Sequence, residues 1–526
     1  MKITTAGMAA VVLAVICAVS IATVLPSSDC GTAPQEGLAY STDGVQDYID
    51  GVHYSVVGGS AVADGFQSGY GSVTVAETVT IGGTGYAVTA VDLGSTHPGV
   101  TDLAIPSDVE ISRTSFTCLP SLVSIDAYGE GSLTSVDGVL FDGDVLVAYP
   151  AGRSADSYTV PDGATAIGDY AFYNSHGLGA VVLPDGLESI GESAFVASGI
   201  TGVSIPDSVT HLGTEAFSSS SAVSAHIGTG ITKIPDSAFL FCTGLETVTG
   251  GGSVTTIGDW GFFECTELAT LPSFPNLRSI GASAFAHCMA LESFEIGPEV
   301  VMIGGSAFYQ CNGIAGFAVD PDNGRFTAEG GVLFDSDATT LINYPLGSPD
   351  SRYTVPGTVT AIGAGAFSGA LNLGSLTIPG TVTTLGDNAL SLMTLDRLEI
   401  PGNPGYSGNT FDRTSVGELV FIGGEDSVDL SIIGGLSDLG SVSFPSSLTD
   451  VTGSAGMTFY VRGGDGDLEP VTDVSADVLA GRTFEFDGSG LVEEDAPSDD
   501  LRTVAAVIIA LLVAAAITAV VCRRSP

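Results

Sequence analysis

Four cysteines recur at regular spacing, and thiols arranged in this way raise the question of metal or redox chemistry. Cys242, Cys265, Cys288 and Cys311 follow one another at intervals of 23 residues, each three residues after a phenylalanine. A structural zinc site needs pairs of ligands at short C-x-x-C spacing, which this series lacks. Parallel side chains in adjacent repeats also give poor disulfide geometry. Other repeats carry serine or alanine in the same slot, so we expect a buried ladder of small side chains, with neither a metal site nor a cofactor.

The residues that common hydrolases use are present, but they do not form the motifs of those enzymes. The six histidines are scattered, and the sequence has no H-E-x-x-H, no G-x-S-x-G and no glycine-rich phosphate loop followed by lysine. Carboxylates are numerous, so a glycosidase-like pair leaves a hydrolase open as an alternative. Asp185 and Asp207 follow prolines and are more simply explained as turn residues. The segment from Asp320 to Gly324 lacks the spacing and the twelfth-position glutamate of a calcium loop. We therefore expect no catalytic residue and a protein that is not an enzyme.

Candidate binding residues come instead from the middle of a recurring apolar–x–apolar segment. If this segment is a short strand, its two apolar residues face inward and the middle residue faces solvent. The middle slot is small, polar and mixed, without a basic stripe or an aromatic platform, which favours a flat protein or glycan partner over a small molecule. The candidates from this slot are Thr249, Glu295, Thr377 and Glu399.

Two aromatic residues add a second kind of candidate. Tyr170 and Trp260 lie two positions before a recurring phenylalanine, where other repeats carry Ser, Glu or Gly. An exposed aromatic side chain in this slot is a candidate anchor for a partner. Local packing is the simpler alternative.

All these slots belong to a repeat of 22 or 23 residues with the pattern L-x-x-h-x-h-P-x-x-h-x-x-h-G-x-x-A-F, where h is apolar. The h-x-h part predicts a short strand, proline closes it, and the glycine is expected to permit the bend into a returning arm. One repeat cannot bury its own apolar face, so the repeats must stack with their strands in a parallel ladder. The closing aromatic falls at Phe172, Phe195, Phe217, Phe239, Phe262, Phe285, Phe308 and Phe367, with Leu390 in the same place.

This pattern resembles the BspA-like leucine-rich repeats, whose unit reads roughly I-P-x-x-V-x-x-I-G-x-x-A-F-x-x-C-x-x-L. Residues 205–217 (IPDSVTHLGTEAF) and 280–296 (IGASAFAHCMALESFEI) match it. A second hallmark is an inserted hairpin, and the sequence Gly-Val-Leu-Phe-Asp, followed by Tyr-Pro and then Tyr-Thr-Val-Pro, begins at Gly138 and again at Gly331. The resemblance covers about residues 86–456. It implies a solenoid fold and a role in adhesion or recognition at a cell surface.

The expected fold is a β-rich leucine-rich-repeat solenoid, a parallel strand ladder with short irregular or helical return arms. The array is predicted over residues 96–460, with hairpin insertions near 135–161 and 328–356. A small β cap or degenerate repeat at 30–95 would cover the open edge of the ladder. The acidic segment 461–502 is expected to be a solvated stalk.

Both ends of the chain are apolar. Residues 1–29 are predicted to be a signal peptide or an N-terminal anchor. The 19 uncharged residues from Val504 to Cys522 are long enough to span a bilayer, and two arginines follow them. We therefore predict a transmembrane helix at 503–522 and a cytoplasmic tail at 523–526. The repeat array would then lie outside the cell, held at the membrane by one or two passes.

The charge balance limits the partners. The chain has 14 Lys and Arg residues against 60 Asp and Glu residues, a net charge of −46. Such a surface repels phosphate backbones, so nucleic-acid binding is not expected. The expected partner is an extracellular protein or glycan of unknown identity, and self-association is possible. A structural cell-envelope component without an external ligand is the alternative.

Overall fold

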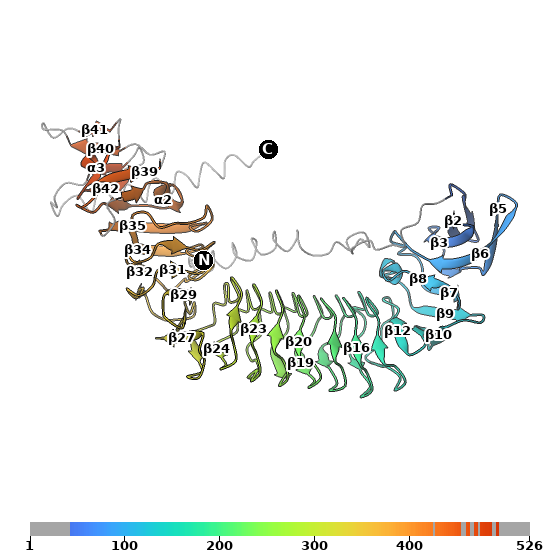
Figure 1. Ribbon diagram of the computed structural model, residues 1–526. Coiled ribbons are helices and arrows are strands. Elements are labelled where there is room, and N and C mark those ends of the chain that lie inside the picture. Colours follow the sequence, from blue (N-terminus) through green and yellow to red (C-terminus); the bar gives the residue numbers. More distant parts are fainter. Residues whose placement is uncertain are drawn as a thin grey trace, which may run out of the picture. The chain divides into compact units, whose positions relative to one another are not determined.

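The computed structural model describes residues 43–423, 427–453, 459–462, 468–471, 474–486 and 491–493 (Figure 1). The chain divides into two compact units, Met1–Gly251 and Gly252–Pro526. The predicted signal or anchor segment, the transmembrane helix and the tail lie outside the described residues. Within those residues, no helix is long and apolar enough to cross a membrane.

The first unit begins with a largely antiparallel sheet. Its strands, in spatial order, are β1 (Gln46–Ile49), β2 (Val52–Val57), β3 (Ser60–Phe66), β6 (Thr84–Val91) and β5 (Thr78–Ile81), with β8 (Glu110–Ile111) on β6. Gly58 and Gly59, both at positive φ, form the tight turn between β2 and β3. The pairing of β3 with β6, and of β6 with β8, is parallel, so the sheet already changes toward a parallel ladder.

A parallel sheet and a hairpin follow in this unit. The sheet consists of β4 (Ser72–Thr74), β7 (Asp102–Pro106) and β9 (Ser124–Tyr128), next to a short 3₁₀ helix η1 (Ser115–Cys118). The hairpin strands are β10 (Leu133–Val136), β11 (Val139–Asp142) and β12 (Val145–Ala148). Because β12 pairs in parallel with β14 (Ala166–Ile167), the hairpin is continuous with a ladder of the repeats.

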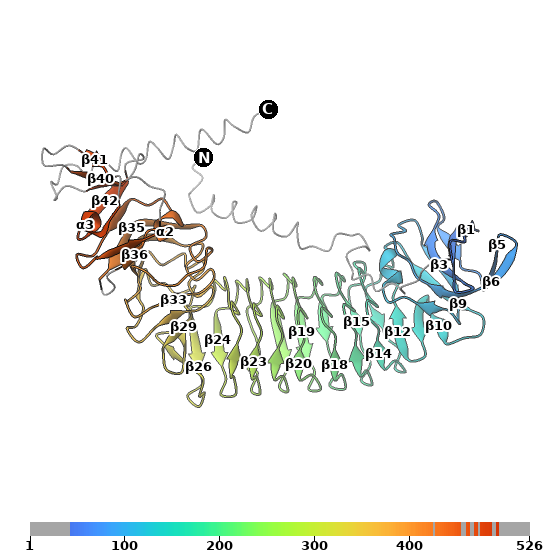
Figure 2. The same cartoon turned by 45° about the horizontal axis from the view of Figure 1, so that its top comes forward.

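Each later coil of the first unit contributes two short strands to two parallel ladders (Figure 2). One ladder contains β14 (Ala166–Ile167), β16 (Ser189–Ile190) and β18 (His211–Leu212), and β20 (Lys233–Ile234) follows in sequence. The other contains β13 (Tyr158–Thr159) with β15 (Val181–Val182), and β17 (Gly202–Ser204) with β19 (Ser224–Ile227) and β21 (Thr247–Gly250).

The second unit repeats this plan with a second hairpin. Its first coils carry β22 (Thr256–Ile257), β23 (Ser279–Ile280), β25 (Met302–Ile303), β24 (Ser293–Ile296) and β26 (Gly316–Val319). The hairpin is β27 (Phe326–Glu329), β28 (Val332–Asp335) and β29 (Thr340–Asn343), and it continues into β31 (Ala361–Ile362) and β33 (Thr384–Leu385). The other ladder runs through β30 (Arg352–Thr354), β32 (Ser375–Thr377), β34 (Thr394–Pro401), β35 (Thr414–Ile422) and β38 (Ser441–Ser443).

The described part of the chain ends in further short elements of the second unit. These are β36 (Ser427–Asp429), α2 (Ser431–Gly434), β37 (Leu436–Ser437), β39 (Asp450–Thr452), β40 (Phe459–Arg462), β41 (Leu468–Pro470), α3 (Ala476–Leu479), β42 (Thr483–Phe486) and β43 (Leu491–Glu493). The chain is thus a β-solenoid of stacked parallel strands with few helices, as the repeat predicts.

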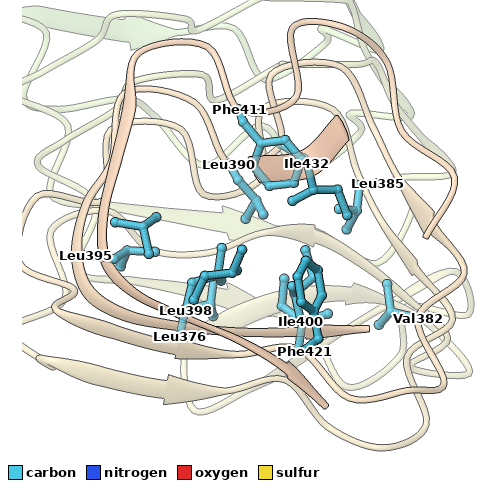
Figure 3. Close-up of a cluster of buried hydrophobic side chains, with 14 of the residues drawn as sticks. Leu376, Val382, Leu385, Leu390, Leu395, Leu398, Ile400, Phe411, Phe421 and Ile432 are labelled. Atoms are coloured by element: carbon cyan, nitrogen blue, oxygen red, sulfur yellow. The ribbon is translucent and has the colours of Figure 1, made fainter. Parts of the chain in front are cut away.

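The recurring phenylalanines form a column in the core of each unit. The rings of Phe172 and Phe195 stack at 4.7 Å with an angle of 9° between their planes, and those of Phe285 and Phe308 stack at 5.8 Å and 3°. All of these side chains are buried. Leucine, isoleucine and valine side chains complete the core, and Figure 3 shows part of it in the second unit, where Leu376 and Leu398 of adjacent strands lie together. A single coil could not bury such a column, so stacking is what creates the core.

The return arms are turns in which two residues adopt the left-handed conformation. In the coil of Phe172 these are Tyr170 and Asn174, both with φ 58°. The N–H groups of these three residues donate to carbonyl oxygens of the next coil at 2.7 to 2.9 Å, while alternate N–H groups close turns within the coil. The stacking hydrogen bonds therefore impose positive φ on side chains that do not favour it.

The glycine of the repeat is required for a reason other than the expected bend. A Cβ atom on Gly213 would lie 2.4 Å from the backbone nitrogen of Glu192 in the preceding coil, and one on Gly304 would lie 2.4 Å from that of Ala282. Neither glycine has a positive φ. Close approach of two coils, rather than backbone freedom, excludes a side chain here.

The structure corrects the expected stalk over the first part of residues 461–502. β42 pairs antiparallel with β38, and Phe484 lies opposite Val442. Phe484 and Leu479 are fully buried in the core of the second unit. These apolar residues do not continue the 22- or 23-residue repeat, so their contribution to the fold does not show as part of that pattern. Residues 474–486 thus belong to the folded unit, and the acidic segment after residue 493 lies outside the described part.

Candidate binding groove on the strand face

Two of the strand-face candidates, Thr249 and Glu295, lie outside the groove described below. Thr249, in β21 of the first unit, is exposed, and its Oγ1 lies 3.1 Å from Nδ1 of His226 on the neighbouring strand. Glu295, in β24 of the second unit, is also exposed and lies opposite Ala318. The alternation that places them outward is the one expected of a strand.

The other two strand-face candidates lie together. Thr377 of β32 and Glu399 of β34 are direct neighbours in the ladder, and both line an open groove of about 490 Å³ over β30, β32 and β34. Thr377 Oγ1 donates a hydrogen bond to Glu399 Oε2 at 3.1 Å. Small-ligand sites have volumes of roughly 300–1,000 Å³, so the groove has room for a ligand of a few sugar or amino-acid residues.

Arg397 fixes the position of the groove's central carboxylate. Its Nε and Nη2 both lie 2.9 Å from Glu399 Oε1, and its Nη1 pairs with Glu418. The hydrogen bond to Glu418 and then that to Glu399 raise the pKa of Arg397. Glu399 therefore has one oxygen on a guanidinium and the other on the hydroxyl of Thr377, a geometry set before any ligand arrives.

Arg352 is a cation of the groove without an ion-pair partner among the residues that the structure describes. It is exposed at the start of β30, in register with Ser375 and, one strand further, Arg397. Sequence reasoning missed Arg352 and Arg397 because it considered only the middle slot of each strand. Both lie one pleat earlier, two residues before Thr354 and Glu399, and face the same side. The signal was available, since the first Tyr-Thr-Val-Pro segment is preceded by Ser157 and the second by Arg352.

Tyr170 is placed differently from the strand-face residues. It is half-buried on a return arm, and its ring lies 5.9 Å from that of Tyr173. Burial, and then the nearby Glu192, raise the pKa of its hydroxyl to about 12. Arg113 bridges Asp169 at 2.5 Å and Glu192 at 3.0 Å in the same region. These contacts favour local packing over a partner-binding role for Tyr170.

Trp260 is the stronger aromatic candidate. Its side chain is 48% exposed, and its φ of 54° places a bulky residue in the left-handed region. This conformation costs roughly 1–2 kcal/mol for a residue with a side chain. The coil does not need tryptophan there, because Ser283 and Gly365 occupy the same slot in other coils of this unit.

The cysteine column consists of buried hydrogen-bond donors. Cys288 Sγ donates to the carbonyl oxygen of Phe262 at 3.1 Å, and Cys311 Sγ donates to that of Phe285 at 2.9 Å. Burial raises the pKa of Cys311 to about 12, so its thiol stays protonated. All five cysteines in the described part of the chain are free and buried, and no group of three His, Cys, Asp or Glu residues there is arranged to hold a metal ion.

One serine–histidine–aspartate cluster in the N-terminal sheet has the residue types of a hydrolase. His53 Nδ1 lies 2.5 Å from Asp64 Oδ1, and Ser55 Oγ donates to Asp64 Oδ2 at 2.6 Å. The carboxylate thus stands between serine and histidine. A nucleophile needs a hydrogen bond to its base, and this order of contacts does not supply one.

Similarity to known proteins agrees with this architecture. A profile of the BspA type leucine rich repeat region, with six copies, matches residues 149–269, 200–315 and 351–457. No curated protein matches the chain.

Several solved structures are similar. A leucine rich cell surface protein from Faecalibacterium prausnitzii is 19% identical, with 78% of this chain and 94% of that chain covered and a TM-score of 0.37. A leucine-rich repeat protein from Eubacterium ventriosum is 26% identical, with 56% and 80% covered and a TM-score of 0.43. The pneumococcal vaccine antigen PcpA is 17% identical, with 79% and 95% covered and a TM-score of 0.33. Because the repeat profile covers more than half of the chain with this coil geometry, the protein belongs to the BspA-type leucine-rich-repeat family.

Proposed function

We propose that this chain is a membrane-anchored cell-surface protein whose repeat array binds an extracellular protein or glycan through its strand face. The observation that carries the proposal is the groove over β30, β32 and β34, in which Arg397 and Thr377 hold Glu399 in place. Paired polar groups lining a groove form a ready-made recognition surface. The apolar run from Val504 to Cys522 would serve as the anchor.

The construction of the solenoid also supports a binding function. The ladder needs only the inward residues and the backbone, so its outward residues are free to differ from coil to coil. Family membership agrees with a binding role, because repeat solenoids generally use their extended surfaces for recognition. We propose binding rather than hydrolysis because the groove's central carboxylate is engaged by its own neighbours.

The proposal is tested by capture experiments with the full-length chain in a non-ionic detergent. Host-cell and matrix extracts are passed over the immobilised protein, intact or after protease or glycosidase treatment, to distinguish a protein partner from a glycan. Thr377→Arg fills the groove and removes the hydrogen bond to Glu399, so we expect at least tenfold weaker capture. Thr358→Arg, at an exposed turn position of the same unit, is the matched control and should bind like the wild type.

The same preparation tests the structural alternative. If the full-length chain captures nothing from any extract and sediments as an assembly, the protein is an envelope component and the binding proposal is wrong. Equal loss of capture in both arginine variants would also contradict a role for the groove.

A further inference from the structure

The chain contains the same structural block twice, and the two copies form an internal comparison. Each begins with a hairpin whose last strand is followed by a buried tyrosine, Tyr149 in the first block and Tyr344 in the second. Tyr149 stacks on Phe172 at 5.2 Å, and Tyr344 stacks on Phe367 at 5.1 Å. The next strand pairs in parallel with the next coil in the same register in both blocks. The first pairing of the ladder is therefore the same in the two copies, whereas the next one differs: β32 pairs with β34, while β15 and β17 belong to different sheets.

The outward residues of the two blocks are nevertheless different. The first block is uncharged at five of these positions, while Asp156 stands where the second block has Ser351. Aligned along the chain, the pairs are Ser157 with Arg352, Ala180 with Ser375, Val182 with Thr377, Gly202 with Arg397, and Ser204 with Glu399. Arg397, Glu399 and Thr377 contact one another, and Arg397 also pairs with Glu418 on the next strand. Arg352 has no ion-pair partner among the described residues, so it is the residue of this face that is available to a ligand.

The charges of the groove limit that ligand. Arg397 is satisfied by Glu399 and Glu418, and Asp396 is exposed beside it. Arg352 therefore remains as the one unpaired guanidinium among the described groove residues, in a lining that also contains the carboxylates of Asp396 and Glu399. A polyanion would be repelled by these carboxylates, whereas a ligand with one negative charge can place it on Arg352.

The remaining lining points to hydroxyl groups on the ligand. Ser351, Thr354, Ser375 and Thr377 can each donate and accept, and the carboxylates accept. Peptide partners commonly bind through aromatic or aliphatic side chains in dry apolar pockets, and the only aromatic side chain of this groove is that of the half-buried Tyr353.

From these observations we infer that the groove over β30, β32 and β34 binds a saccharide carrying a single carboxylate, held by Arg352. The inference rests on the proposed binding function and narrows its ligand. Ligand hydroxyls donate to Asp396 and Glu399, and the ligand carboxylate accepts from the guanidinium of Arg352. The first block, with Ser157 in place of Arg352, lacks this site.

The test is isothermal titration of the full-length chain, in non-ionic detergent at low salt, with three singly acidic oligosaccharides. These are sialyllactose, a disaccharide ending in glucuronic acid and one ending in galacturonic acid, each compared with its neutral counterpart. We expect at least one acidic sugar to bind tenfold or more tightly than its neutral counterpart. Arg352→Ser, which installs the first block's residue, should abolish this preference.

A matched control and a second variant accompany it. Arg325→Ser removes the same charge at an exposed position of the same unit outside the groove, and should keep the preference. Thr377→Val, again the first block's residue, frees Glu399 and should weaken acidic and neutral sugars alike.

Two results would overturn the inference: no acidic sugar preferred over its neutral counterpart, or the same preference in the wild type and Arg352→Ser. If Thr377→Arg still weakens capture from extracts but no acidic sugar is preferred in the titrations, only the assignment of a saccharide ligand is wrong. If that capture is absent as well, the proposed function falls with it.

Discussion

At the scale of single residues, Trp260 combines two unfavourable features, exposure of a large apolar ring and a left-handed backbone. Such outliers persist where the surrounding structure or a function maintains them. The hydrogen bond from its backbone N–H to Ala282 imposes the backbone conformation on whichever residue occupies this slot. The backbone conformation therefore does not explain why this slot holds tryptophan. Its exposed side chain must supply the reason, so Trp260 is a better candidate anchor than Tyr170.

This reasoning predicts that Trp260→Asn does not destabilise the fold. Asparagine tolerates the left-handed region, and Asn388 occupies the same slot of another coil with φ 54°. We expect the free energy of unfolding, measured by urea denaturation, to stay the same or rise by about 1 kcal/mol. Capture from extracts should fall if the indole is an anchor. A loss of stability above about 1 kcal/mol would instead show that the ring packs structurally.

A second residue-scale prediction concerns His287. Burial lowers its pKa to about 4, and its ring makes edge contacts with Phe263 at 5.4 Å and Tyr309 at 5.5 Å. Its Nδ1 has no hydrogen-bond partner among the residues that the structure describes. The carboxylate of Glu264 is 3.8 Å away, too far for a hydrogen bond. The folded state therefore holds this imidazole neutral over a pH range in which the unfolded chain protonates it.

Protonation of His287 should destabilise the folded state as the pH falls. Because the folded pKa lies below the unfolded value of about 6.5, the stability contribution is complete above pH 6.5 and is lost as the pH falls toward 4, by at most about 3 kcal/mol. Burial raises the pKa of Glu264, so that residue acts in the opposite direction on acidification. His287→Phe should flatten the urea midpoint between pH 6.5 and 4 relative to the wild type, whereas His211→Phe, on an exposed strand residue, should not. Parallel curves for wild type and His287→Phe would refute the assignment.

At the scale of elements, the coil is defined by how closely its backbone approaches the preceding coil. Gly304 and Gly305 are adjacent in one turn, yet a Cβ on Gly304 would lie 2.4 Å from the backbone of Ala282 while one on Gly305 would meet nothing within 4 Å. Gly304→Ala should therefore force the coils apart and destabilise by roughly 1–3 kcal/mol. Gly305→Ala should be neutral or slightly stabilising. The urea midpoints of the two variants measure the difference, and equal midpoints would show that the coils can separate at no cost.

The stacked core could be predicted from the sequence, but the conformation of the return arms could not. The register of Phe172, Phe195 and Phe217 predicts the stacked core because burial imposes one period on every coil. The left-handed residues are not predictable, since Ser, Glu, Phe and Trp have no preference for positive φ and take it only from hydrogen bonds between coils.

Among the candidate site residues, Thr377 and Glu399 could be predicted from the sequence, because alternation along a strand decides which side chains face outward. Arg397 was not predicted because its pairing with Glu418 on the neighbouring strand depends on ladder register that a single repeat does not display. The same limit explains the C-terminal sheet, where Phe484 joins β38 from a distant part of the chain.

At the scale of the whole molecule, the dominant physical property is its net charge of −46. Charges spread along stacked coils repel one another over distances that the solvent ions set, and the core must outweigh this repulsion. The Debye length falls from about 30 Å at 0.01 M to about 3 Å at 1 M ionic strength, so added salt should remove most of the repulsion between coils. We therefore expect the thermal midpoint of the full-length chain, followed by circular dichroism, to rise steadily with sodium chloride over this range.

The ion dependence separates screening from specific binding. Potassium chloride at equal ionic strength should give the same midpoints if screening is the cause. A midpoint that stays flat or falls with salt would show that the surface carboxylates are too well solvated to oppose stacking. A much larger rise with calcium chloride at matched ionic strength would instead reveal cation sites formed by the acidic coils.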